Sequence, residues 1–211
     1  MSLAPLSGKH IFKSFAAPSG EIAPGPRSFS IGESELTLSA SVDDRFAGVL
    51  TFSLAPDNAV EVEEAYGIAT GLPGGITPKF GRFFSGLGYL NEQHQHVWDF
   101  YDAPLVYQAF FGGQYTQNGV QAKWVAPTDT FVELGAEAGS GDGFPGNDRN
   151  RNGVGDVVAY VHAGGDVGAS HSWRAGLSYL QTSASDRSYA QTDVAGRDVV
   201  VGFTGKSRIA V

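Results

Sequence analysis

The stretch from Glu33 to Leu54, ESELTLSASVDDRFAGVLTFSL, decides the fold class because apolar and polar residues alternate along most of it. A period of two predicts β-strands with one apolar face and one polar face. The dipeptide Asp43-Asp44 separates two such segments and predicts a tight turn. The apolar residues of the first segment are Leu36, Leu38, Ala40 and Val42, and those of the second include Phe46, Leu50, Phe52 and Leu54.

The same period continues along most of the chain. Turn-forming residues at 72–75 and an Asn-Gly pair within 116–119 separate neighbouring segments. Further strands are predicted at 59–71, 75–85, 107–115, 119–126, 130–138, 156–167, 171–183 and 197–205. With about 9–10 strands and no convincing helix, the sequence predicts an all-β, antiparallel, up-and-down fold.

Composition excludes several classes of protein. No apolar run approaches the ~18 residues of a transmembrane helix. The 211 residues contain no cysteine, which excludes disulfides, cysteine-bound zinc and thiol catalysis. The net charge of -8 disfavours a nucleic-acid partner. The N-terminus has no apolar core of signal-peptide length, so we expect any export signal to lie outside this chain.

Strand and loop lengths favour a transmembrane β-barrel over a soluble β protein. Predicted strands of about 9–12 residues suit a tilted membrane crossing, and short turns alternate with long loops after the first strands. We expect a poorly structured extension at 1–27 and a partial barrel at 28–211. This barrel portion includes a long aromatic loop at 86–106 and a polar loop at 139–155. A soluble β-sandwich is the alternative.

Several long motifs resemble a family of Gram-negative outer-membrane barrels labelled porin-like or zinc-regulated TonB-dependent outer-membrane receptor. The run KFGRFF at 79–84, with its long loop and following Gly-rich strand, is also similar to phosphate-selective porins. The resemblance covers about residues 25–182. Its motifs are GESELTLSASVD (32–43), VEVEEAY (60–66), KFGRFFSGLGYLNEQHQHVWDF (79–100), DAPLVYQAFFGGQY (102–115), APTDTFVELGAEAG (126–139) and GGDVGASHSWRAGLSYL (164–180).

The resemblance implies a barrel located in the outer membrane and contacting its lipid. Barrels of this family are longer than the chain, so we expect this chain to be the N-terminal portion of a larger barrel. The expected function is a porin-like channel for passive diffusion of a small solute or ion, without catalysis or a required cofactor. A homo-oligomeric assembly is compatible with this expected channel function. The alternatives are a TonB-dependent receptor for a metal or metal chelate, and a soluble calcium-binding β module.

Charged residues on the polar strand faces and in the long loop are candidates to line a channel, because rings of charge set the selectivity of pores. Their acidic excess predicts a weak preference for cations. The candidates are Glu33, Glu35, Lys79, Arg82, Asp99, Asp102, Lys123, Glu133 and Glu137.

Two metal sites are also candidates. Residues 148–156, DRNRNGVGD, match part of a calcium loop but lack the glutamate at its last position. Its ligands would be Asp148, Asn150, Asn152, the Val154 carbonyl and Asp156. In an extended segment Glu92, His94 and His96 would point the same way and provide zinc ligands. The alternative for each is a polar loop that binds no metal.

Overall fold

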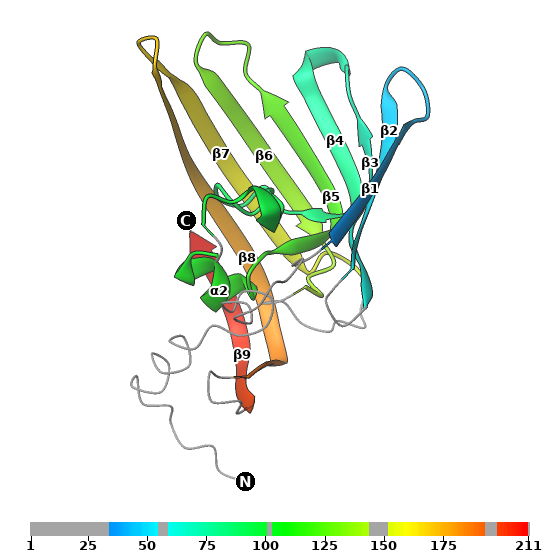
Figure 1. Cartoon of the computed structure of the whole chain (residues 1–211), viewed down its shortest axis with the longest axis vertical. Coiled ribbons are helices and arrows are strands. Elements are labelled where there is room, and N and C mark those ends of the chain that lie inside the picture. Colours follow the sequence, from blue (N-terminus) through cyan, green and yellow to red (C-terminus); the bar gives the residue numbers. More distant parts are fainter. Residues whose placement is uncertain (1–33, 55–58, 101–102, 144–151, 193–197, 211) are drawn as a thin grey trace.

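The computed structural model describes residues 34–54, 59–100, 103–143, 152–192 and 198–210. These residues form one antiparallel sheet of nine strands, and each strand pairs with the next along the chain (Figure 1). The strands are β1 (Ser34–Ser41), β2 (Phe46–Leu54), β3 (Val60–Ala69), β4 (Ile76–Phe84), β5 (Thr116–Val125), β6 (Phe131–Gly139), β7 (Asp156–Val167), β8 (His171–Thr192) and β9 (Asp198–Ala210). The predicted extension at 1–27 lies outside the described residues.

The prediction of an all-β, antiparallel, up-and-down fold is confirmed. The sheet is open within the described residues, with β1 and β9 at its two edges. No helix in this part of the chain is both long and apolar enough to span a membrane.

All the connections at one end of the sheet are short, whereas the other end has two long connections beside the short ones at 55–59 and 193–197. At one end four short turns occupy residues 42–45, 70–75, 126–130 and 168–170. At the other end residues 85–115 connect β4 to β5, and residues 140–155 connect β6 to β7. Figure 1 shows the short turns together at the top, away from helix α2 (Leu105–Phe111).

Local chemistry explains two of the short turns. The Asp43 carboxylate accepts hydrogen bonds of 2.7 Å from the backbone N–H groups of Arg45 and Phe46, which closes the β1–β2 turn. In the 3-10 turn Pro73–Gly75 (η2), Gly74 has a φ of 83°, which glycine adopts without steric cost. Both predicted turns are therefore confirmed.

The two faces of the sheet reverse the usual pattern of a water-soluble protein. We call the face that carries the 85–115 connection the inner face and the opposite face the outer face. On the outer face, Leu177 and Val120 are 63% and 56% exposed. On the inner face, Glu137 and Gln121 are only 3% and 2% exposed. Cross-strand register puts Phe80, Val120, Ala138 and Val157 in one outer row across β4 to β7, beside an inner row of Lys79, Gln121, Glu137 and Val158.

One predicted strand was wrong. Residues 107–115 contain most of α2 and the residues that follow it, because Pro104 precedes the helix and Gly112 ends it with a φ of 66°. The predicted turn at Thr116–Gly119 was also wrong, since these residues belong to β5 and pair with β4. The connection between β4 and β5 is consequently longer than the predicted loop at 86–106.

Candidate functional site

The connection from β4 to β5 lies against the polar face of the sheet, and we call its described residues, 85–100 and 103–115, the inner segment. The segment contains the 3-10 turn Gln95–Val97 (η3) and α2. In Figure 1 both lie in front of the sheet. Four sets of contacts hold the inner segment in place, three against the strands and one between its own two ends.

The first attachment is the Glu137 carboxylate on β6. It accepts hydrogen bonds from Ser85 Oγ at 2.6 Å and from the Gly86 backbone N–H at 2.8 Å. Gln121 Nε2 on β5 donates to the same carboxylate at 2.7 Å. A buried carboxylate is stable only when its oxygens are well bonded, so these three donors explain how Glu137 lies inside the protein.

The second set joins the two ends of the inner segment. Asn91 is fully buried. Its amide nitrogen donates to the carbonyls of Ser85 and Tyr115 at 2.8 Å each. Its amide oxygen accepts from the Tyr115 backbone N–H at 2.7 Å. One side chain therefore holds the start and the end of the segment side by side.

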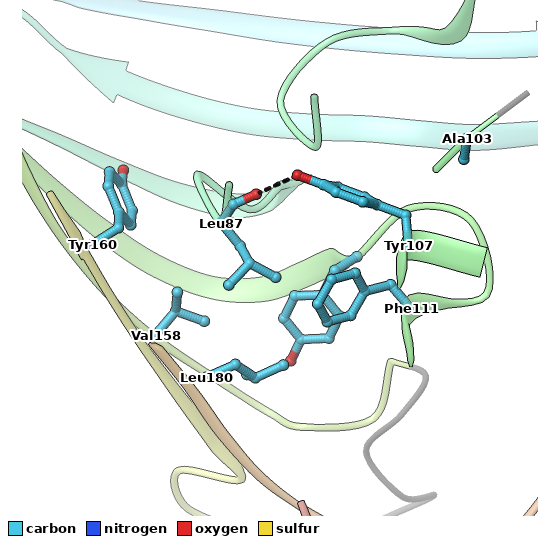
Figure 2. Packing of buried hydrophobic residues seen from close by; sticks show 8 residues of the cluster. Leu87, Ala103, Tyr107, Phe111, Val158, Tyr160 and Leu180 are labelled. Carbon is cyan, nitrogen blue, oxygen red and sulfur yellow. Dashed lines mark hydrogen bonds between the residues drawn. The ribbon is translucent and has the colours of Figure 1, made fainter. Parts of the chain in front are cut away.

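The third set is a small apolar cluster, shown in Figure 2. Tyr107 and Phe111, one helical turn apart on α2, pack edge to face with ring centroids 5.5 Å apart. Leu87 and Phe111 pack with Val158 and Leu180, which project inward from β7 and β8. At the edge of the cluster the Tyr115 hydroxyl donates to Asp156, and burial raises the pKa of Tyr115 well above its usual range. The hydroxyl therefore stays protonated as a donor.

Glycines make room for the ring of Tyr160 between the sheet and the inner segment. A Cβ at Gly135 would lie 1.9 Å from the Tyr160 ring, and a Cβ at Gly86 would lie 2.4 Å from it. Any larger residue at either position must displace the ring, so the close approach of the segment depends on both glycines.

The fourth set gathers charged side chains where the inner segment meets β1 and β3. His94 Nδ1 lies 3.2 Å from a Glu35 oxygen and 3.1 Å from a Glu63 oxygen, and its Nε2 lies 3.1 Å from Glu64. His96 Nδ1 lies 3.2 Å from the other Glu35 oxygen. Hydrogen bonds to Glu63 and Glu64 raise the pKa of His94 to about 10. We call these five residues the His94 cluster.

Two hollows flank the inner segment. A cavity of about 990 Å³ lies between the segment and strands β6 to β8, lined in part by Tyr89, His162 and Arg174. A cavity of about 170 Å³ lies on the β2–β4 side, lined in part by Glu61, Arg82 and Gln114. Both are bordered by charged and aromatic side chains, which suits a polar solute.

Most of the predicted channel-lining residues within the described ranges lie on the inner face or at the segment. Glu133 pairs with His162 at 3.1 Å, and Lys123 pairs with Glu92 of the inner segment. Arg82 Nε donates to the Val62 carbonyl at 2.9 Å. Lys79 Nζ lies over the rings of Tyr66 and Phe83, whereas Asp99 is exposed. Glu33 and Asp102 lie outside the described residues.

The structure rearranges the predicted zinc ligands. His94 is followed by the 3-10 turn η3, so residues 92–96 are not the extended run that the prediction assumed. Glu92 pairs with Lys123 instead of joining the two histidines. His94 and His96 meet glutamates from β1 and β3.

The predicted calcium loop is only partly described. Asp148 and Asn150 lie outside the described residues, so this site stays a prediction. Asn152 and Val154 are exposed, and Asp156 faces inward at the start of β7, where Tyr115 donates to it.

Sequence reasoning placed Glu63 and Glu64 on a polar strand face but did not join them to the histidines, and it missed Asn91. The signal for the glutamates was the doublet in VEVEEAY, which breaks the alternation of the strand. Register shifts at this point, because Thr51 pairs with Glu64 while Phe52 pairs with Val62. The resulting β-bulge lets the consecutive residues Glu63 and Glu64 reach the same side. No sequence signal marked Asn91.

No family model matches the chain. The chain is 43% identical over 116 residues, 55% of its length, to an uncharacterized protein of Aquifex aeolicus. The match spans 24% of that protein, so the chain covers only about a quarter of this relative.

Proposed function

We propose that this sheet is part of the wall of a β-barrel in a bacterial outer membrane, and that the barrel is a porin-like channel for small solutes. The observation that supports the proposal is the reversal of the two faces, with large apolar side chains exposed outside and charged side chains buried inside. In a membrane barrel, apolar residues face lipid and polar residues face the lumen.

The magnitude of the exposed apolar surface favours lipid over water as the surroundings. Burying a large apolar side chain fully contributes about 1.5–3 kcal/mol. If eight such side chains stayed half-exposed in water, the protein would lose on the order of 10 kcal/mol of the free energy gained by burial, which is as large as the net stability of a typical domain. These residues are Leu36, Leu38, Phe80, Val120, Leu134, Val157, Leu177 and Tyr179.

Strand geometry agrees with this proposal. Strands β2 to β7 have 9 to 12 residues each, and a tilted strand needs about 9–11 residues to cross the hydrocarbon. The short turns would lie at the periplasmic end and the long connections at the outer end, as in bacterial barrels. Unpaired backbone groups at an exposed edge are costly in lipid. We therefore propose that further strands cover the edges at β1 and β9.

The inner segment would narrow the lumen of such a barrel. It is held against the wall by Glu137, by the aromatic cluster and by the His94 cluster. Solutes would pass by diffusion through the remaining hollows, with no cofactor. Acidic side chains outnumber basic ones along this path, which favours cations. The acidic residues are Glu35, Glu61, Glu63, Glu64, Glu92, Glu133 and Glu137, and the basic ones are Lys79, Arg82, Lys123 and Arg174.

Conductance across a planar bilayer tests the function. The full-length protein is purified in detergent, and its insertion is checked by heat-modifiable migration in gels. We expect discrete, ohmic conductance steps and a reversal potential in a KCl gradient that indicates cation preference. Inserted protein that produces no conductance steps would contradict the channel.

A further inference from the structure

The His94 cluster brings together side chains from three separate parts of the chain. Glu35 comes from β1, Glu63 and Glu64 come from β3, and His94 and His96 come from the inner segment. One oxygen each of Glu35 and Glu63 and one nitrogen of His94 all lie within 4.8 Å of one another. These side chains are largely buried, with 14% exposure for Glu35, 16% for Glu63 and 19% for His94.

The separations of these atoms suit a small metal ion. Zinc binds nitrogen and carboxylate oxygen at about 2.0–2.2 Å in a tetrahedron, so neighbouring ligand atoms are about 3.3 Å apart. His94 Nδ1 lies 3.2 Å from Glu35 Oε2 and 3.1 Å from Glu63 Oε2. Two of the three separations are therefore close to those between tetrahedral ligands, and the two glutamate oxygens lie within 4.8 Å of each other.

The remaining members of the cluster are placed as outer partners of such ligands. A metal-binding histidine usually donates its other ring N–H to a carboxylate, which fixes its tautomer. Glu64 lies 3.1 Å from His94 Nε2, in the position of that partner. His96 Nδ1 lies 3.2 Å from the second oxygen of Glu35 and orients that carboxylate.

Charge also favours a cation. Three carboxylates of the cluster, Glu35, Glu63 and Glu64, meet only two imidazoles. Buried carboxylates of like charge repel, and a divalent ion between them would offset more of this repulsion than the single charge of a protonated His94. The bulge in β3 adds Glu63 to the side that Glu64 already occupies, which increases this repulsion.

We propose that His94, Glu35 and Glu63 bind a divalent transition metal ion such as Zn²⁺, with Glu64 and His96 orienting the ligands. The ion would fasten residues 92–98 of the inner segment to β1 and β3. It would thus fix the position of the segment that narrows the lumen. Binding itself depends only on the described contacts, whereas an effect on conductance rests on the proposed channel.

Metal binding to the full-length protein in detergent tests this site. Isothermal titration with Zn²⁺ after treatment with a chelator is expected to give one site per chain. X-ray absorption of the zinc-loaded protein is expected to show nitrogen and oxygen ligands near 2.0–2.1 Å with imidazole scattering. Absence of stoichiometric binding, or a spectrum with oxygen ligands only, would overturn the proposal.

Two variants and two matched controls locate the site. We expect His94→Gln and Glu63→Gln each to weaken Zn²⁺ binding at least 10-fold. The controls are His171→Gln, an exposed histidine on β8, and Glu61→Gln, an exposed glutamate two residues before Glu63. Both control variants should bind Zn²⁺ with the affinity of the unaltered protein. Equal affinity in His94→Gln and His171→Gln would contradict the assignment.

Measuring the conductance of the zinc-loaded protein distinguishes a failure of the metal site from a failure of the proposed channel. Zinc binding with measurable conductance supports both, and the conductance should then change on chelation and recover on adding Zn²⁺. Zinc binding without conductance supports the metal site and contradicts the channel. Conductance without zinc binding supports the channel and contradicts the metal site.

Discussion

Tyr160 shows how single residues set the distance between the inner segment and the sheet. Its ring lies where side chains at Gly86 and Gly135 would be, and it stacks on His162 with ring centroids 4.8 Å apart. The ring has little room to move, because the inner segment covers one side and β6 covers the other. The Tyr160 ring therefore fits only because both Gly86 and Gly135, which lie in different elements, have no side chain.

Adding a methyl group at Gly135 tests this requirement. In Gly135→Ala the new Cβ would lie 1.9 Å from the Tyr160 ring, and such overpacking typically costs about 1–3 kcal/mol. We expect a lower free energy of unfolding in lipid vesicles, measured by urea titration of tryptophan fluorescence. The control is Gly48→Ala on β2, whose Cβ would meet nothing within 4 Å. A control that loses as much stability as Gly135→Ala would contradict the steric explanation.

Glu137 makes a second residue-scale prediction. Glu137→Ala removes the acceptor of Ser85 Oγ and of the Gly86 N–H, which leaves buried donors without a partner. We expect the inner segment to become more accessible, and limited proteolysis within 85–115 to accelerate about 10-fold or more. In the same variant the conductance should rise.

The matched control for Glu137→Ala is Glu61→Ala, which removes an exposed glutamate from β3. It should leave the cleavage rate unchanged. If Glu137→Ala were cleaved no faster than this control, Glu137 would not hold the segment.

At the scale of single residues, sequence reasoning found His94 and His96 and named Glu35 as a channel-lining candidate, but it did not bring them together. Spacing along the chain identified zinc ligands only within 92–96, whereas the structure joins His94 to glutamates some 30 and 60 positions earlier. Such partners depend on which strands the segment packs against. A bulge that places Glu63 beside Glu64 cannot be derived from a strict period of two.

At the scale of elements, alternation predicted the strands well where one face is apolar and the other polar. β1, β2, β6 and β7 lie within one or two residues of their predicted ranges. The error at 107–115 has a different origin. VYQAFF has strong β propensity, but Pro104 and Gly112 bound a short helix whose aromatic residues pack onto the sheet. Tertiary packing decided the structure there.

The outer face of β8 gives a prediction at the scale of an element. Leu177 is 63% exposed near the middle of the strand portion that pairs with β7. An arginine at the bilayer midplane costs about 2–4 kcal/mol and near an interface about 0–1 kcal/mol. We therefore expect Leu177→Arg to lower the free energy of unfolding in lipid vesicles by about 2–4 kcal/mol.

Gln181→Arg is the control for Leu177→Arg, since Gln181 is on the same face of β8, four residues closer to the long-connection end. We expect a loss of about 1 kcal/mol or less there. Similar losses at both positions would show that depth in a bilayer does not govern the effect.

The whole molecule is an open antiparallel sheet whose polar face carries a folded segment and whose apolar face is left exposed. The alternation of the sequence predicted both faces. It did not predict which face would be covered, because a period of two is equally compatible with a soluble sandwich and a membrane wall. The buried glutamates beneath the inner segment are an observation that supports the proposed membrane wall.

The claim that the apolar face contacts lipid can be tested most directly with spin labels, since the chain contains no cysteine. Single cysteines replace consecutive residues of β7, Val157→Cys to Ala163→Cys, and each is labelled in the full-length protein in lipid vesicles. We predict high oxygen and low nickel-chelate accessibility at residues 157, 159, 161 and 163, alternating with low oxygen accessibility at 158, 160 and 162. High nickel-chelate accessibility at the odd-numbered positions, or no period of two, would contradict the account.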